Sequence, residues 1–184
     1  ESQGSRLLPF SNEIYIERED FKEEANRKFF RLTLGKEVRL KNAYIIKGES
    51  VIKDAEGNII EIHCTYDADS KSGSGSEASM RKVKGTIHWV SVAHALEATV
   101  HNYDRLFSDE SPDQHKEKSF LDFINPSSLS SQKAMVEPSL NDLTIGERVQ
   151  FQRLGYYVVD KTSNSSQLVF NKTVGLRDSR TKKI

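Results

Sequence analysis

The sequence has 184 residues, of which 36% are hydrophobic and 29% charged, and its 27 basic residues balance its 27 acidic ones. This length allows one medium domain or two small ones. No apolar run approaches the roughly 18 residues that a membrane-spanning helix needs, and no signal-peptide pattern is present. A single cysteine excludes an internal disulfide and favours a reducing, cytoplasmic compartment. Because the chain does not begin with Met, we expect it to be a piece of a larger protein.

The zero net charge excludes a uniformly polycationic coat, but the charges are segregated along the chain. Residues 27–53 carry eight basic and two acidic residues, a net charge of +6, whereas residues 10–26 and 97–122 each have a net charge of −4. The tail is basic again, with Lys172, Arg177, Arg180, Lys182 and Lys183. This pattern is compatible with a basic face that binds a polyanion and, equally, with chance clustering on a solvated surface.

The first predicted elements are a strand and a helix. Residues 13–17 alternate apolar and polar side chains, which predicts a half-buried strand. Asp20, followed three residues later by Glu23, has the pattern of a capping box and predicts a helix that ends at Gly35. An apolar stripe at helical spacing supports this helix and consists of Phe21, Ala25 and Phe29.

Further strands follow. Residues 38–46 predict a strand that places Arg39 and Lys41 on one face, about 7 Å apart. Residues 51–66 predict a hairpin with its turn at residues 54–58. The expected inner face of its second strand consists of Ile60, Ile62, Cys64 and Tyr66.

The middle of the chain predicts a loop and one more strand. Residues 67–80 are rich in Ser and Gly and predict a flexible loop. Residues 82–91 predict a strand with Ile87 and Trp89 pointing inward and Lys82 and Lys84 pointing outward.

The last third predicts a short helical patch that ends at Asn125 and two late strands, at residues 148–160 and 167–174. Many short strands with little helix indicate an all-β fold of small barrels rather than a doubly wound sheet.

The sequence contains no recognisable catalytic or metal-binding pattern. The five histidines and Cys64 lack the spacing of a metal site, and Gly73-Ser-Gly75 lacks the lysine and the preceding strand of a phosphate-binding loop. What remains is a set of basic residues interleaved with aromatic ones, which suits single-stranded RNA because unstacked bases stack on aromatic rings. For Phe29 and Phe151, packing in the core is the simpler interpretation.

Eight segments, in order from about residue 5 to residue 179, carry a specific resemblance. The chain resembles the C-terminal, anticodon-binding half of bacterial glutaminyl-tRNA synthetases. The nucleotide-binding signatures of the class I catalytic half, a His-x-Gly-His motif and a Lys-Met-Ser-Lys-Ser-like loop, are not in this sequence. The segments are Glu13–Phe21, Arg31–Tyr44, Cys64–Asp67, Lys82–Ser91, Tyr103–Phe107, Glu137–Leu140, Gln150–Tyr156 and Phe170–Asp178.

The resemblance implies an all-β fold of two small L25-like β-barrels, one inserted in the other, with a short helix. A proximal anticodon-binding barrel would combine residues 1–27 with residues 107–184, and a distal one would consist of residues 28–106. The two acidic segments of the chain fall near these boundaries.

The resemblance also implies roles for individual residues. The third anticodon base is assigned to Arg31, the first base to Arg39 and Lys41, and the middle base to Gln150 and Arg153. Arginine can bind guanine or phosphate through two parallel hydrogen bonds, and glutamine both donates to and accepts from a base edge. A regular strand would place Gln150 and Arg153 on opposite faces, so both serve one base only if the strand ends or bulges near Leu154-Gly155.

Three positions depart from the family. The related synthetases have glutamine, lysine and arginine where this chain has Lys28, Phe30 and Lys41. Lys41 keeps the charge but lacks the planar fork of arginine, which loosens the expected contacts to the first base. Phe30 replaces a charge with a ring that can stack on a base.

By this resemblance, the segment recognises the anticodon of tRNA(Gln) so that an upstream class I catalytic domain of the same chain can attach glutamine with ATP. We expect the segment itself to be a non-catalytic monomer without a cofactor, without a membrane contact and located in the cytoplasm. Two alternatives remain open: the C-terminal domain of a eukaryotic or archaeal-type glutamyl-tRNA synthetase, which shares this architecture, and a free-standing L25-like RNA-binding protein.

Overall fold

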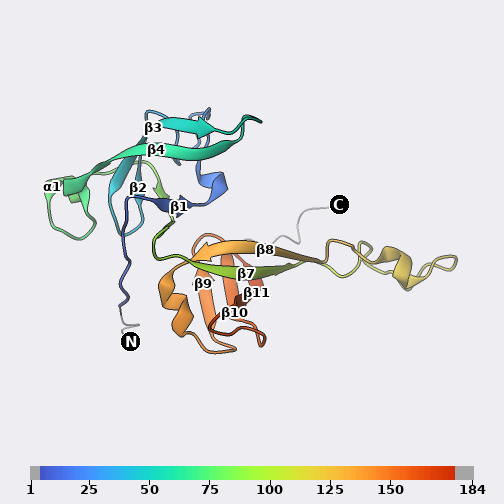
Figure 1. Ribbon diagram of the computed structural model, residues 1–184. Coiled ribbons are helices and arrows are strands. Elements are labelled where there is room, and N and C mark those ends of the chain that lie inside the picture. The colour runs from blue at the N-terminus through green and yellow to red at the C-terminus, as the bar shows by residue number, and fades with distance from the viewer. Residues whose placement is uncertain (1–4, 177–184) are drawn as a thin grey trace. The chain divides into compact units, whose positions relative to one another are not determined.

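The computed structural model describes residues 5–176, and the chain folds into two compact units (Figure 1). One unit takes the chain up to Leu8 and again from His94 onward, and the other consists of Pro9–Ala93. One unit is therefore inserted in the other, but the seams of these units differ from those expected after residue 27 and before residue 107. No helix in the described part of the chain is long and apolar enough to cross a membrane.

The Pro9–Ala93 unit is built on a four-stranded sheet with the order β4-β3-β2-β5 and a two-stranded sheet of β1 and β6. The pairing of β2 with β5 is parallel, and the other pairings are antiparallel. Three single-turn helices complete the unit: η1 (Arg18–Asp20), η2 (Ala68–Ser70) and α1 (Glu77–Met80). The strands are β1 (Ile14–Ile16), β2 (Glu37–Leu40), β3 (Ile45–Lys53), β4 (Ile59–Asp67), β5 (Thr86–Ile87) and β6 (Trp89–Ser91).

Strand β2 alternates as predicted, but it is shorter than predicted. Val38 and Leu40 are fully buried, so Glu37 and Arg39 point to the opposite face. The strand ends at Leu40, and Lys41 begins a turn that contains Asn42 at a left-handed φ of 58°. The expectation that Arg39 and Lys41 share one face of a continuous strand is therefore wrong.

The helix predicted between Asp20 and Gly35 is absent. The backbone of Phe21 instead forms a bridge to Leu32, and both side chains are buried in the core of the sheet. Two backbone hydrogen bonds, from Lys22 N to Leu32 O (3.2 Å) and from Leu32 N to Asp20 O (3.0 Å), close the intervening residues into a loop. A helix of this length is only marginally stable on its own, and burial of both ends of the segment overrides its periodicity.

The expected inner face of the hairpin is also wrong. Ile60 and Tyr66 of β4 are 64% and 59% exposed, Cys64 is exposed and Ile62 is half-buried. The pairing of β3 with β4 shifts register twice, between residues 48 and 50 and between residues 52 and 53. The second shift leaves Ile60 of β4 outside the pairing, and β4 is an edge strand of the sheet, where an alternating apolar face need not be buried.

The second unit contains a five-stranded sheet with the order β8-β7-β11-β10-β9, in which β7 and β11 are parallel. Its core is formed by Ala98, Val100, Val136, Tyr157, Val159, Leu168 and Phe170. It also contains the 3₁₀ helices η3 (Phe120–Phe123) and η4 (Pro138–Asp142). The strands are β7 (Leu96–Tyr103), β8 (Leu129–Val136), β9 (Arg148–Phe151), β10 (Gly155–Val159) and β11 (Leu168–Gly175).

The all-β class is confirmed, although the last third differs in detail from the prediction. The expected strand at residues 148–160 is two strands, β9 and β10, joined by a turn. The sequence did not predict β7 and β8, whose pairing runs over eight residues from Leu96–Val136 to Tyr103–Leu129. Strand β8 lies at the edge of the sheet and is mostly exposed and polar, so it carries little hydrophobic periodicity.

Candidate nucleic-acid interface

An open groove of about 740 Å³ lies in the Pro9–Ala93 unit. Three short stretches of chain bring the lining residues together: residues 27–31, residues 35–37 and residues 82–84, with Lys47 of β3 beside them. Six lining residues are basic, one is acidic and two are aromatic: Arg27, Arg31, Lys36, Lys47, Lys82 and Lys84, then Glu37, then Phe29 and Phe30.

Most of the positive charge in this groove is uncompensated. Lys47 lies 3.1 Å from Glu49, and Arg31 pairs with Asp20, but the other four cations form no ion pair with another described residue. The acid in the groove, Glu37, is itself engaged by Arg81 in a two-point ion pair. A concave surface with this balance attracts a polyanion such as RNA.

Arg31 is held in place from behind by a buried carboxylate. Asp20 is fully buried, and Nη1 of Arg31 donates a hydrogen bond to Oδ1 of Asp20. The Arg31 side chain is 37% exposed, so part of the guanidinium faces the groove while part is anchored. An anchored guanidinium is preorganised to present its remaining donors to a base edge or a phosphate.

Phe30 lies beside Arg31 and is positioned by its own neighbours. The residue is 53% exposed, and Nζ of Lys84 lies 6.0 Å from the centroid of its ring. Gly85 has a φ of 138°, and a Cβ at this position would come within 2.3 Å of the Phe30 carbonyl oxygen. Only glycine therefore permits this close approach, which places the 82–84 stretch against the backbone of Phe30. An exposed ring next to two cations is the arrangement on which an unstacked base can lie.

The other residues assigned to the first unit's anticodon contacts do not line this groove. Lys28 and Lys41 are exposed in turns outside it. The two Nη atoms of Arg39, which carry four N–H groups, donate four hydrogen bonds within the protein, to residues 70, 72, 79 and 81. The structure thus brings Arg31 and Phe30 together in one groove and places Lys28, Arg39 and Lys41 elsewhere.

Gln150 and Arg153 lie in the second unit, at the end of the β9–β10 hairpin. Gln150 is exposed and pairs with Tyr156 across the ladder. The strand ends at Phe151, and Arg153 adopts a left-handed φ of 68° in the turn that follows. Because the strand ends before Arg153, the side chains of Gln150 and Arg153 are not forced onto opposite faces of one strand. Phe151 stacks on Tyr157 at 4.3 Å, as expected for a core residue.

The sequence assigned a contact to only one of the six basic residues in the groove, Arg31, and to none of the other five: Arg27, Lys36, Lys47, Lys82 and Lys84. A signal for two of them was present, because Lys82 and Lys84 alternate with the inward residues of the predicted strand. The tail cations Arg177, Arg180, Lys182 and Lys183 lie outside the described residues. Within the described residues, no group of three or more His, Cys, Asp or Glu side chains could hold a metal ion.

Two family models match the chain, at residues 1–67 and 86–160, and both are described as "tRNA synthetases class I (E and Q), anti-codon binding domain". Curated relatives named "Glutamine--tRNA ligase" are similar over almost the whole chain. The protein from Rhodopirellula baltica is 57% identical over 180 residues, which cover 97% of this chain and 30% of the relative. Those from Proteus mirabilis and Escherichia coli O157:H7 are 54% and 55% identical over 96% of this chain and 31% of each relative.

The chain thus spans about 30% of the length of these relatives. The matched residues contain every position to which the resemblance assigned an anticodon contact, in residues 28–41 and in the β9–β10 hairpin. The chain belongs to the family of anticodon-binding domains of the class I tRNA synthetases for E and Q.

Proposed function

We propose that this chain is the anticodon-binding region of a glutaminyl-tRNA synthetase and binds the anticodon stem-loop of tRNA(Gln). In the longer cytoplasmic protein, a class I catalytic domain would attach glutamine with ATP, and this region would select the tRNA. The observation that carries the proposal is the groove in the Pro9–Ala93 unit, where uncompensated cations surround an exposed phenylalanine and an anchored arginine. The relatives, which are named as glutamine–tRNA ligases, support the choice of tRNA.

Each unit has its own part in the proposed readout. In the Pro9–Ala93 unit, Arg31 would read the third anticodon base, with Phe30 as its stacking platform. Lys41 would contact the first base, and Lys28 would approach the RNA from the edge of the loop. In the second unit, Gln150 and Arg153 would bind the middle base from the β9–β10 hairpin.

The experiment that tests this proposal compares two groove residues of different expected roles. Arg31→Gln removes a base-reading guanidinium, whereas Lys36→Gln, the matched control, removes a groove cation that would contact only phosphate. We expect Arg31→Gln to cost about 1–3 kcal/mol of binding free energy and to relax discrimination at the third anticodon position. Lys36→Gln should weaken all hairpins about equally and lower the salt slope by about one unit or less.

The measurement is a fluorescence titration of anticodon stem-loop hairpins that carry each of the four bases at the third position. The ratio of affinities between hairpins does not depend on the fraction of protein that is folded, so a loss of stability in Arg31→Gln does not mimic a loss of readout. If Arg31→Gln weakens all four hairpins by the same factor, Arg31 is a phosphate contact and the assigned base readout is wrong.

A further inference from the structure

The segment 67–85 connects opposite edges of the four-stranded sheet. It leaves the sheet at the end of β4, one edge of the order β4-β3-β2-β5, and returns to it at β5, the other edge. A connection of this kind passes β3 and β2, and its Ser- and Gly-rich sequence has few apolar side chains with which to pack there. Its position must therefore be fixed by polar contacts.

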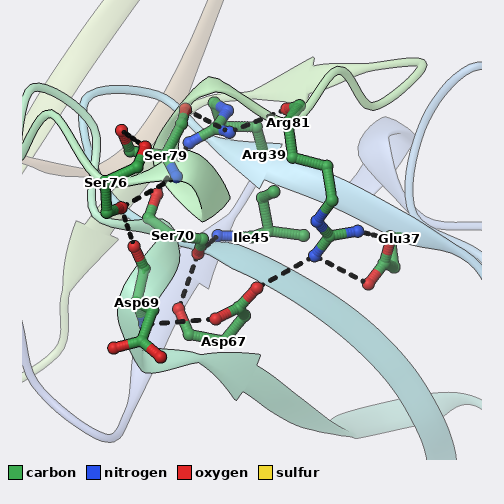
Figure 2. A network of polar contacts seen from close by, with 9 residues as sticks. All are labelled: Glu37, Arg39, Ile45, Asp67, Asp69, Ser70, Ser76, Ser79 and Arg81. Atoms are coloured by element: carbon green, nitrogen blue, oxygen red, sulfur yellow. Dashed lines mark hydrogen bonds and ion pairs between the residues drawn. The ribbon is translucent and has the colours of Figure 1, made fainter.

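Arg39 of β2 supplies the central set of these contacts (Figure 2). Nη1 donates to the carbonyl oxygen of Ser70 (2.9 Å) and to Oγ of Ser72 (3.2 Å). Nη2 donates to the carbonyl oxygens of Ser79 (3.0 Å) and Arg81 (3.1 Å). The backbone N–H of Arg39 also donates to the carbonyl oxygen of Gly85 (3.0 Å). One side chain thus ties both halves of the segment to the middle of the sheet.

A second arginine, Arg81, connects the later part of the segment to its first residue, Asp67, and to Glu37 of β2. Nη2 of Arg81 lies 3.0 Å from Oδ2 of Asp67, at the last residue of β4, and its guanidinium also makes the two-point contact with Glu37 of β2 (Figure 2). Inside the segment, Ser70 is fully buried: its Oγ donates to the Asp67 carbonyl oxygen (2.6 Å) and accepts from Ile45 N (2.8 Å). Where the sequence predicted a flexible loop at residues 67–80, the structure has a segment with two short helices, η2 and α1, held by these polar contacts.

The ordered segment leads directly into one side of the groove. Lys82 and Lys84, which line the groove, follow Arg81, and the close approach of Gly85 to Phe30 fixes the other end of this stretch. We propose that residues 67–85 form a preformed wall of the RNA-binding groove, that Lys82 and Lys84 in it contact RNA phosphates, and that Arg39 is a positioning residue that acts through this wall and not on an anticodon base. This inference rests on the proposed function, and it changes the role that the family resemblance implies for Arg39.

The hydrogen bonds of Arg39 favour a role in positioning the segment 67–85 over a role in binding an anticodon base. A guanidinium whose four Nη hydrogens are already donated has no pair of parallel donors left for the edge of a base. Release of these donors to RNA would leave the carbonyl oxygens of Ser70, Ser79 and Arg81 without this partner and would free the wall. Arg39 therefore contributes more to RNA binding by keeping its contacts with residues 70–81 than by contacting a base.

The test uses the full chain with Arg39→Lys, which keeps the charge but cannot make four directed hydrogen bonds. Without RNA, we expect hydrogen exchange of the amides in residues 70–81 to become at least about tenfold faster, while the core strands β2 and β3 keep their protection. With RNA, the affinity for the four hairpins that differ at the first anticodon base should fall by one common factor. Unchanged exchange, or a loss confined to one first-position base, would overturn the proposal.

Two further variants keep the test decisive if Arg39→Lys fails to fold. Arg81→Lys should also accelerate exchange in residues 70–81, because it removes the two-point contact that closes the segment. Lys82→Gln with Lys84→Gln should leave exchange unchanged and lower the salt slope of hairpin binding by about one to two units. An unchanged salt slope would show that these lysines do not contact RNA. If the unmodified chain binds no hairpin at all, the proposed function fails, whereas the exchange experiment still tests the positioning role.

Discussion

At the scale of single residues, the pair of Asp20 and Arg31 links the stability of the fold to the proposed recognition of RNA. Asp20 is fully buried and accepts a hydrogen bond from Arg31, whose side chain lies partly in the groove. A buried carboxylate that loses a cationic partner costs more free energy than an exposed one, because water cannot replace the lost contact. Replacement of Arg31, the proposed base-reading residue, therefore carries a cost in stability.

This pair leads to a prediction for stability. Arg31→Gln should lower the free energy of unfolding by about 1–3 kcal/mol, because it removes the charge that faces the buried Asp20 carboxylate. Asp20→Asn combined with Arg31→Gln should lose less than the sum of the two single variants, since an amide needs no cation beside it. Urea unfolding of the four proteins measures this coupling. Strict additivity would show that the two side chains do not depend on each other.

The family resemblance assigned roles to Arg31, Phe30, Gln150 and Arg153, and the structure places Arg31 and Phe30 together in the groove. The sequence could not show that Arg39 donates to the carbonyl oxygens of residues 70, 79 and 81. These oxygens lie far from Arg39 in the sequence, and backbone oxygens have no sequence pattern. The buried partner of Arg31 was also hidden, since Asp20 has the pattern of a helix cap. Contacts made by backbone atoms and by buried carboxylates depend on tertiary structure.

At the scale of elements, strands with clear alternation were predictable and weak or interrupted ones were not. Strand β2 and the inward residues Ile87 and Trp89 follow the two-residue period, and they are buried as predicted. The prediction of a helix between Asp20 and Gly35 was wrong because Phe21, the first residue of the expected apolar stripe, forms a bridge to Leu32. Strand β8 was not predicted because an exposed edge strand need not be apolar.

The turn between β10 and β11 leads to a prediction of how stability depends on pH. Hydrogen bonds from the side chain and the backbone of Thr162, and then from the Asn171 side chain, lower the pKa of Asp160 from 3.8 to about 2. Since the pKa is lower in the folded protein, this contribution to stability is fully present above about pH 4 and is lost as the pH falls through about 2.

Asp160→Asn should therefore be less stable than the unmodified chain near neutral pH, and the difference should shrink between pH 4 and pH 2. Asp113→Asn, at an exposed aspartate outside this turn, is the matched control for the removal of one carboxylate. Thermal unfolding measured at several pH values compares the three proteins. A difference for Asp160→Asn that stays constant from pH 7 to pH 2 would contradict the assigned role of these hydrogen bonds.

At the scale of the whole molecule, the chain combines two all-β units whose proposed contacts to RNA come from different kinds of structure. The Pro9–Ala93 unit offers a basic groove with an aromatic ring, and the second unit offers the end of a hairpin. Residues 9–27 belong to the same compact unit as the residues that follow them, and the two expected barrels, residues 1–27 with 107–184 and residues 28–106, stay a prediction. The strand pairing of β1 with β6 accounts for this placement.

The most direct test of the central claim is a titration of the full chain with two RNA hairpins that share one stem. One hairpin carries the glutamine anticodon, and the other has all three anticodon bases changed. We expect the glutamine hairpin to bind at least about tenfold more tightly, a difference of about 1.4 kcal/mol. This difference should persist as the salt concentration rises, because contacts to the bases produce it. A hairpin with the glutamate anticodon serves as the third arm. Equal affinity for all hairpins, or tighter binding of the glutamate hairpin, would contradict the claim that this chain reads the glutamine anticodon.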